Sequence, residues 1–170
     1  YLRFFSKNQN LEFKGLDISG NDRALKIDLE KDKLPYADAS VDQVLLFNIL
    51  EHIYNYQYLL SECRLVLKNS GQVLGFVPFL VGVHPDPHDY FRYTKEALEK
   101  IFSEAGFQEI KTREIGGGPF ILNYNNLVNY LPAIFKVIIL PFYYFMDYLV
   151  LRLKPSLRHK FPLGYFFEIS

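Results

Sequence analysis

Over the first two thirds of the chain, short apolar runs alternate with amphipathic segments. The runs at 13–18, 24–29 and 41–47 have the length of strands, and the last is the near-continuous type that is buried on both faces. Residues 55–68 and 95–105 instead repeat apolar side chains at helical spacing. Strands that alternate with helices predict an α/β domain with a mostly parallel sheet.

Turn-forming residues are expected to end both helices. Residues 69–71 (Asn-Ser-Gly) follow the first helix and suit left-handed backbone geometry, and Gly106 follows the second. Thr94 is a good N-cap for that second helix. After these turns we expect strands at 72–77 and 107–115.

The last third has a different pattern. Residues 127–153 are heavily apolar and aromatic, although two prolines, Lys136 and Asp147 interrupt them, and basic residues follow between 152 and 160. We expect two helices that cover the sheet and precede a final strand at 163–169. An interfacial helix on a lipid surface is the alternative, and the charges and prolines disfavour a single membrane span.

Composition narrows the class of protein. The chain has 170 residues, enough for one domain, with 49% hydrophobic and 22% charged residues. Its zero formal net charge gives no general attraction to nucleic acid. Cys63 is the single cysteine, so we expect a core thiol in a cytoplasmic protein, and no cysteine-based metal site. If the protein contacts a membrane peripherally, we expect the contact to be made by residues 127–160.

Two carboxylates suggest a nucleoside site. Asp17 and Asp28 end successive predicted strands, and ligands of open α/β sheets bind beyond the carboxyl ends of the strands. Asp17 could accept two hydrogen bonds from a ribose diol, and Asp28 one from an adenine amine. Alternatively, Asp17 is a turn residue that caps its own backbone, and Asp28 is a solvated turn residue beside Glu30 and Asp32.

The stretch from Leu34 to Gly71 contains LPYADASVD, then NILEHI at the end of a predicted strand, then RLVLKNSG after a helix. It closely resembles the type 11 branch of the class I S-adenosylmethionine-dependent methyltransferases, and the resemblance covers roughly residues 1–115. It implies a Rossmann-like, mostly parallel sheet with helices on both faces. Residues 116–160 would then be a helical insertion and 161–170 the final strand of a single domain.

The resemblance also implies a cofactor, S-adenosyl-L-methionine, and residues that bind it. They are Asp17 and Ile18 at the ribose and adenine, Asp28 and Leu29 at the adenine amine and ring, and Phe47 and Asn48 at the methionine end.

Two features depart from the family pattern. The glycine-rich loop that approaches the methionine moiety should lie just before Tyr1, so the domain is expected to be incomplete at its N-terminus. Residues 19–23 are also too short for a helix between two strands. A non-catalytic Rossmann-like binding domain that has lost cofactor capture is therefore the main alternative. LPYADASVD and EHI argue against a third option, a dinucleotide-dependent oxidoreductase.

The catalytic residues are the least defined. His52, at a predicted helix start, and His84 and Tyr90, in a polar loop, are weak candidates for acid–base chemistry. No metal site is predicted there, because the spacing fits no standard pattern. Alternatively the loop is structural, with Arg92 paired to Asp89. The expected acceptor is an unidentified small molecule, sugar or lipid-like compound.

Overall fold

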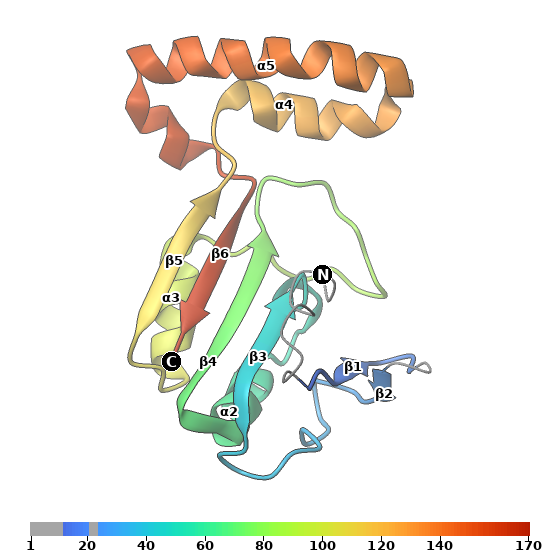
Figure 1. The fold of residues 1–170 in the computed structure, drawn as a ribbon, viewed down its shortest axis with the longest axis vertical. Helices are drawn as coiled ribbons and strands as arrows, with labels where there is room; N and C mark the ends of the chain where they lie inside the picture. Colours follow the sequence, from blue (N-terminus) through green and yellow to red (C-terminus); the bar gives the residue numbers. More distant parts are fainter. Residues whose placement is uncertain (1–11, 21–23) are drawn as a thin grey trace.

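The computed structural model describes residues 12–20 and 24–170 of the chain. It contains two groups of strands, two helices that pack on the larger group, and a helical hairpin (Figure 1). In chain order the elements are β1 (Gly15–Asp17), β2 (Ala24–Lys26), β3 (Val41–Phe47), η1 (Leu50–His52), α2 (Tyr56–Val66), β4 (Leu67–Pro78), α3 (Lys95–Glu104), β5 (Ile110–Ile115), α4 (Pro119–Leu127), η2 (Val128–Tyr130), α5 (Ala133–Leu153), η3 (Pro155–Lys160) and β6 (Gly164–Ile169).

The larger sheet has the order β3-β4-β6-β5. β3 and β4 are parallel, and β6 is antiparallel to both of its neighbours, β4 and β5. β5 therefore runs in the same direction as β3 and β4, with β6 as the reversed strand. β1 and β2 form a separate two-stranded parallel sheet. The predicted α/β class is confirmed, and three of the four strands of the larger sheet run in the same direction.

One face of the larger sheet carries the core. Leu46, Val73, Val77 and Phe167 are buried there together with residues of α2 and α3, and the rings of Phe102 and Phe167 lie 4.8 Å apart. α2 and α3 both lie behind the sheet in Figure 1. No helix covers the other face within 12–20 and 24–170, although the resemblance implied helices on both faces.

The two sheet helices end differently. α3 matches the prediction, because the Thr94 side chain accepts a hydrogen bond from Ala97 N at 3.2 Å and Gly106 has a φ of 89°. The left-handed turn predicted at 69–71 is wrong. α2 ends at Val66 and the next residue, Leu67, is already extended and pairs with Val41. The register then moves on to Gln43 opposite Gln72, so these residues form an irregularity within β4.

The hairpin of α4 and α5 lies across the ends of β5 and β6 (Figure 1). Three glycines with positive φ, at 116–118, lead into α4. The buried Asp147 of α5 accepts hydrogen bonds from the N–H groups of Phe120 (3.0 Å) and Ile121 (2.7 Å), which ties α5 to the first turn of α4. A helical insertion before the last strand was predicted correctly. Its predicted covering of the sheet is wrong, because most apolar side chains of α5 are exposed.

Candidate functional site at the carboxyl edge of the sheet

Two loops meet at the carboxyl edge of the larger sheet. β3 leads into the short helix η1, and the parallel strand β4 leads into a loop at residues 79–94. The loop folds back on η1, because the carbonyl oxygen of Glu51 accepts hydrogen bonds from Tyr90 N (2.8 Å) and Phe91 N (3.3 Å). This is the edge at which open α/β sheets bind their ligands.

Glu51 is the most unusual residue at this edge. Its side chain is 0% exposed, and neither carboxylate oxygen has a hydrogen-bond partner among the described residues. Burial raises the pKa of the Glu51 carboxyl, while the nearby side chains of His52 and His84 act in the opposite direction. The sequence pattern alone explains Glu51 as an acidic residue at a helix start, whereas the family resemblance implies that Glu51 and His52 lie beside the cofactor pocket.

The structure brings His52 and His84 together around Glu51. The Nε2 atom of each ring lies 3.8 Å from the same oxygen, Glu51 Oε1. The two rings are perpendicular, with their centres 5.4 Å apart. Two of the three catalytic candidates thus share one site, although they are 32 residues apart in the sequence. Their catalytic roles stay predictions.

An ion pair holds the loop that carries His84. Arg92 binds both oxygens of Asp89, with Nη1–Oδ1 and Nη2–Oδ2 distances of 2.5 and 2.7 Å. Asp89 also accepts a hydrogen bond from the backbone N–H of His84 at 2.9 Å. The Arg92 guanidinium holds the pKa of the Asp89 carboxyl well below its usual range. The predicted Asp89–Arg92 pairing is confirmed, and its contact with the His84 backbone shows that it shapes the site.

Tyr90, the third candidate, is placed differently. Its ring lies 5.4 Å from that of Tyr54 and 5.2 Å from that of His88. The side chain is 42% exposed. It therefore belongs to an aromatic group on the surface of the loop.

The two predicted nucleoside carboxylates make local contacts. Asp17 Oδ1 accepts hydrogen bonds from the backbone N–H (2.8 Å) and the hydroxyl of Ser19, and these bonds lower the pKa of Asp17. The Asp28 carboxylate accepts a hydrogen bond from Glu30 N (3.0 Å) and lies 2.7 Å from Lys31 Nζ. The bond to Lys31 is the main cause of the lowered pKa of Asp28. These contacts fit a turn-stabilising role, and nucleoside binding stays a prediction for both.

The other predicted cofactor residues lie at or just beyond the ends of strands from both sheets. Ile18 is 54% exposed beside β1, and Leu29 is half-buried after β2. Phe47 is half-buried at the end of β3, and the next residue, Asn48, has a φ of 53° and donates its N–H to Phe76 O at 2.9 Å. No backbone pairing joins β1 or β2 to β3 in the described part of the chain, so one continuous cofactor cradle stays a prediction.

Side-chain contacts do connect the Asp28 turn to the region of η1. Glu30 Oε1 accepts a hydrogen bond from Tyr54 N at 2.7 Å, and Glu30 O accepts one from Asn55 Nδ2 at 2.9 Å. Glu62 of α2 accepts a hydrogen bond from Leu34 N at 2.9 Å. The segment after β2 is therefore held against α2, close in sequence to Glu51 and His52.

Cys63 behaves as predicted. It is 0% exposed on the inner face of α2, and burial raises the pKa of its thiol to about 12. A thiol with that pKa stays protonated near neutral pH and is a poor nucleophile. Cys63 is a core residue.

Comparison with known proteins agrees with the pattern in the sequence. Residues 6–75 match the family model for a methyltransferase domain. The chain is 38% identical over 107 residues to an uncharacterized protein of Methanocaldococcus jannaschii, an alignment that covers 61% of this chain and 41% of that protein. It is 28% identical over 93 residues to a protein of Mycobacterium tuberculosis described as a probable S-adenosylmethionine-dependent methyltransferase, covering 51% and 34% of the two chains. The chain thus spans less than half the length of either relative.

Solved structures show the same fold. The crystal structure of an S-adenosylmethionine-dependent methyltransferase from Archaeoglobus fulgidus superposes with a TM-score of 0.63 and 18% identity, over 99% of this chain and 80% of that one. At this identity the likeness concerns the fold alone. It includes the insertion before the last strand, since nearly all of this chain is covered.

Proposed function

We propose that the chain takes part in methyl transfer from S-adenosylmethionine to a small-molecule, sugar or lipid-like acceptor. The match of residues 6–75 to the methyltransferase family carries the proposal. That segment includes β1, β2, β3, η1 and α2, and hence both predicted nucleoside carboxylates and Glu51–His52. Transfer from a sulfonium depends mainly on proximity and in-line alignment, so the proposal assigns no general base.

We propose that Asp17 holds the ribose hydroxyls of the cofactor. Its carboxylate already accepts a hydrogen bond from a hydroxyl group, that of Ser19, so a ribose hydroxyl is a chemically equivalent donor. The exposed side chain of Ile18 lies next to it in the chain and supplies apolar surface for an adenine ring. Asp28 and Leu29 would lie at the adenine edge, and Phe47 and Asn48 at the methionine end.

Calorimetry with S-adenosylhomocysteine tests this part of the proposal. Asp17→Asn keeps the size of the side chain and removes its charge, and we expect at least about a tenfold loss of affinity, as for a lost hydrogen bond to a charged group. Asp42→Asn is the matched control, because Asp42 lies near the opposite end of β3 and its side chain is 82% exposed. Wild-type protein that does not bind the ligand would favour the non-catalytic binding domain instead.

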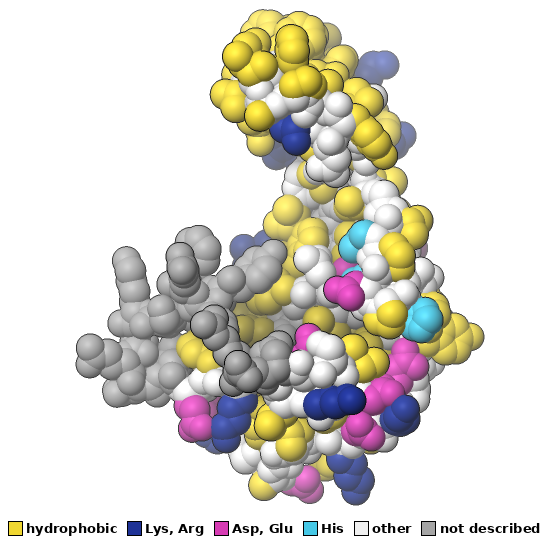
Figure 2. All heavy atoms as spheres, turned by 90° about the vertical axis from the view of Figure 1, so that its right-hand side faces the viewer, with side chains coloured by type: hydrophobic (Ala, Val, Ile, Leu, Met, Phe, Trp, Pro, Cys, Tyr) yellow, Lys and Arg dark blue, Asp and Glu magenta, His cyan; other side chains and the backbone are white. Residues whose placement is uncertain are grey.

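We further propose that the hairpin of α4 and α5 rests on a lipid surface and that the acceptor is lipid-like. Many large apolar side chains of α5 are exposed, and the part of the molecule that holds the hairpin is largely hydrophobic in Figure 2. These side chains include Ile134, Phe135, Val137, Ile138, Phe142, Tyr144, Phe145, Tyr148 and Leu149. Exposed apolar side chains grouped on one helix are typical of a protein or membrane contact.

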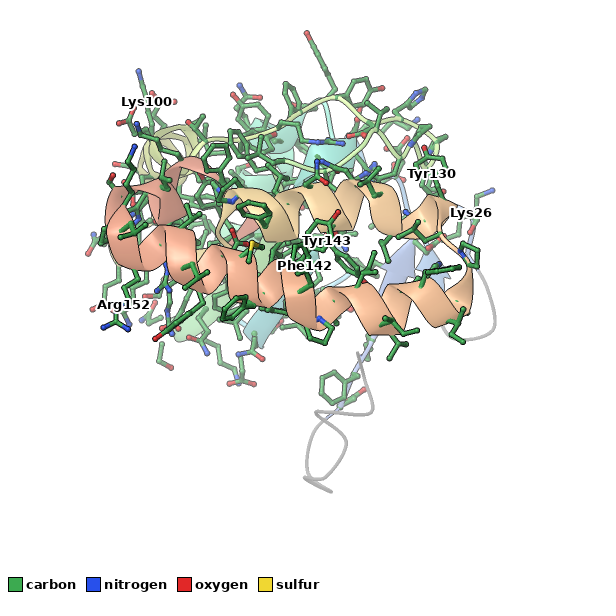
Figure 3. All side chains as sticks on the ribbon, turned by 90° about the horizontal axis from the view of Figure 1, so that it is seen from above. Lys26, Lys100, Tyr130, Phe142, Tyr143 and Arg152 are labelled. Carbon is green, nitrogen blue, oxygen red and sulfur yellow. The ribbon has the colours of Figure 1, made fainter. Side chains whose placement is uncertain are left out.

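Charge at the end of the hairpin favours an anionic lipid surface. Arg152 lies near the C-terminal end of α5 (Figure 3), and η3 adds Arg158 and Lys160. Basic residues beside an apolar helix face attract anionic headgroups. The hairpin also lies at the end of the molecule where β3, β4 and β5 terminate (Figure 1), so a lipid-like acceptor bound there is near the carboxyl edge.

Length and composition alone would also let α5 cross a bilayer, since it has 21 residues and a mean hydropathy of 1.7. Asp147 favours the interfacial arrangement, because its hydrogen bonds to Phe120 and Ile121 require α4 and α5 to stay side by side. Extraction of membranes at alkaline pH distinguishes the two: a peripheral protein is released and a spanning one is retained.

Co-sedimentation with vesicles tests the surface. We expect binding to vesicles of phosphatidylglycerol and phosphatidylcholine, and a several-fold loss for Phe145→Ser, whose side chain is 54% exposed in the wild type. Leu65→Ser on α2 is the matched control, because Leu65 is 47% exposed and lies far from the hairpin in the sequence. Equal losses for the two variants, or no sedimentation of the wild type, would contradict a lipid-facing hairpin.

A further inference from the structure

The starting observation is the buried carboxylate of Glu51. Within residues 12–20 and 24–170 neither of its oxygens has a hydrogen-bond partner, and its side chain is 0% exposed. Leaving a buried polar group unsatisfied costs about 1–3 kcal/mol, and more for a charged one. Such a group needs an explanation, and an ion bound at the site is one.

The two histidines are oriented toward this carboxylate by their other ring nitrogens. His52 Nδ1 lies 2.5 Å from the carbonyl oxygen of His88, and His84 Nδ1 lies 2.9 Å from that of Gly82. A carbonyl oxygen only accepts, so each Nδ1 carries the proton and donates it. Arg92 Nη2 is farther from His84 Nδ1, at 3.4 Å, and its shorter contact at 2.7 Å is to Asp89 Oδ2. In the neutral form of each ring, Nε2 then carries the lone pair on the side of Glu51.

Backbone carbonyls that fix the tautomer of an imidazole are characteristic of metal-ligating histidines. The ligand-capable atoms of Glu51, His52 and His84 lie within 4.8 Å of one another. In a tetrahedral site with bonds of about 2.1 Å, ligand atoms are separated by about 3.4 Å. The observed Nε2–Oε1 distances of 3.8 Å require only a small inward movement.

We propose that Glu51, His52 and His84 bind a divalent transition-metal ion at the carboxyl edge of the sheet. Two imidazoles and one carboxylate suit zinc, iron(II), cobalt or manganese better than magnesium or calcium, which prefer oxygen ligands. Three protein ligands leave at least one coordination position for water or an acceptor oxygen. The side chain of His84 is 42% exposed, which gives an ion a route from solvent.

The surroundings are built to hold this arrangement. Asp89 fixes the backbone of His84 and is itself held by Arg92, with its side chain 2% exposed. The carbonyl oxygen of Glu51 fixes the loop from the other side through Tyr90 N and Phe91 N. The ligands thus come from two loops that are joined by hydrogen bonds. A bound metal could polarise an acceptor oxygen, and this role rests on the proposed methyl transfer. Metal binding by the three residues does not depend on that function.

Cobalt(II) binding to the untagged protein tests the site. After treatment with a chelator, we expect the protein to take up about one cobalt ion per chain, seen by mass spectrometry of the metal and by visible absorption of the ligand field. Glu51→Gln and His84→Ala should each weaken binding by at least about tenfold. His84 is exposed, so its replacement should leave the fold intact, as circular dichroism would verify.

His88→Ala is the matched control. His88 is in the same loop and exposed, and its contribution to the site is a backbone carbonyl that the variant retains. The proposal is overturned if the wild type takes up no stoichiometric cobalt, or if His84→Ala and His88→Ala bind it equally.

Calorimetry with S-adenosylhomocysteine on the same samples separates this inference from the proposed function. Cobalt uptake without binding of the nucleoside would contradict methyl transfer and leave the metal site standing. Nucleoside binding without cobalt uptake would contradict the metal site and leave the proposed methyl transfer standing.

Discussion

Helices α3 and α5 use hydrophobic residues in opposite ways. In α3 the apolar side chains form one stripe, and Leu98 and Phe102 are both 0% exposed against the sheet. In α5 apolar residues occur on all sides, and the buried residue is a carboxylate, Asp147. Phe142 and Phe145 of α5 are more than half exposed.

The difference distinguishes apolar surface that the chain buries against itself from apolar surface that stays exposed and available for contact with something else. The stripe of α3 is fully accounted for by its contacts in the core, so it is explained by folding alone. The large apolar side chains of α5 stay mostly exposed in the described chain, so their burial within the fold contributes little. The composition of α5 is therefore better explained by the lipid surface proposed above than by stability.

The largest expected effect is in the core. Phe102→Ala removes a fully buried ring that lies 4.8 Å from that of Phe167. We expect a loss of about 3–5 kcal/mol in the free energy of unfolding, from lost burial and the cavity left behind. Urea denaturation followed by circular dichroism measures it. A loss below about 1 kcal/mol would show that α3 is not part of the cooperative core.

A second prediction concerns the junction of the hairpin. Asp147→Ala leaves the N–H groups of Phe120 and Ile121 without their acceptor, at a cost of about 1–3 kcal/mol. We expect the loss to be local, so amide hydrogen exchange should accelerate in α4 while exchange in β4 is unchanged. Unchanged exchange in α4 would mean that Asp147 does not hold the two helices together.

The contrast between core and hairpin also explains what the sequence could predict. Helix α3 could be predicted from its apolar stripe, the Thr94 cap and Gly106, because all three features are local in the sequence. The end of α2 was missed because the pairing of Leu67 with Val41 outweighs the turn preference of residues 69–71. That pairing is a contact across the sheet, which local reasoning does not see.

The residues of the candidate site also fall into those that local sequence features could identify and those that depend on contacts across the fold. Asp17, Asp28 and the end of β3 could be found from strand patterns and a family resemblance. The group of Glu51, His52 and His84 could not, because His84 reaches Glu51 only when the loop after β4 folds back on η1. The apolar composition of α5 can be seen in the sequence. That α5 does not cover the sheet depends on where the hairpin lies in the fold, which the sequence does not show.

A third prediction uses the buried thiol in the core. The pKa of Cys63 is about 12 in the folded protein, whereas an unfolded thiol titrates near 9. The unfolded state therefore loses this proton first. The contribution of the Cys63 thiol to the free energy of unfolding is complete below about pH 9. It falls by about 1.4 kcal/mol per pH unit as the pH rises from there toward 12.

Urea denaturation between pH 8 and 10 measures this slope. Cys63→Ala should flatten it, whereas Ser61→Ala, an exposed position on the same helix, should leave it unchanged. The same slope in wild type and Cys63→Ala would mean that other groups cause it.

The smallest expected effect is on the outward side of α5. Val137 and Ile138 are 73% and 63% exposed, so replacing either with threonine removes little apolar area from contact with the protein. We expect a change within about 0.5 kcal/mol in the free energy of unfolding in the absence of lipid. The same replacements should reduce vesicle binding, because the lost apolar surface is the one proposed to contact the membrane. A large loss of stability in solution would instead show that this side of α5 packs against the protein, and the difference between α3 and α5 would disappear.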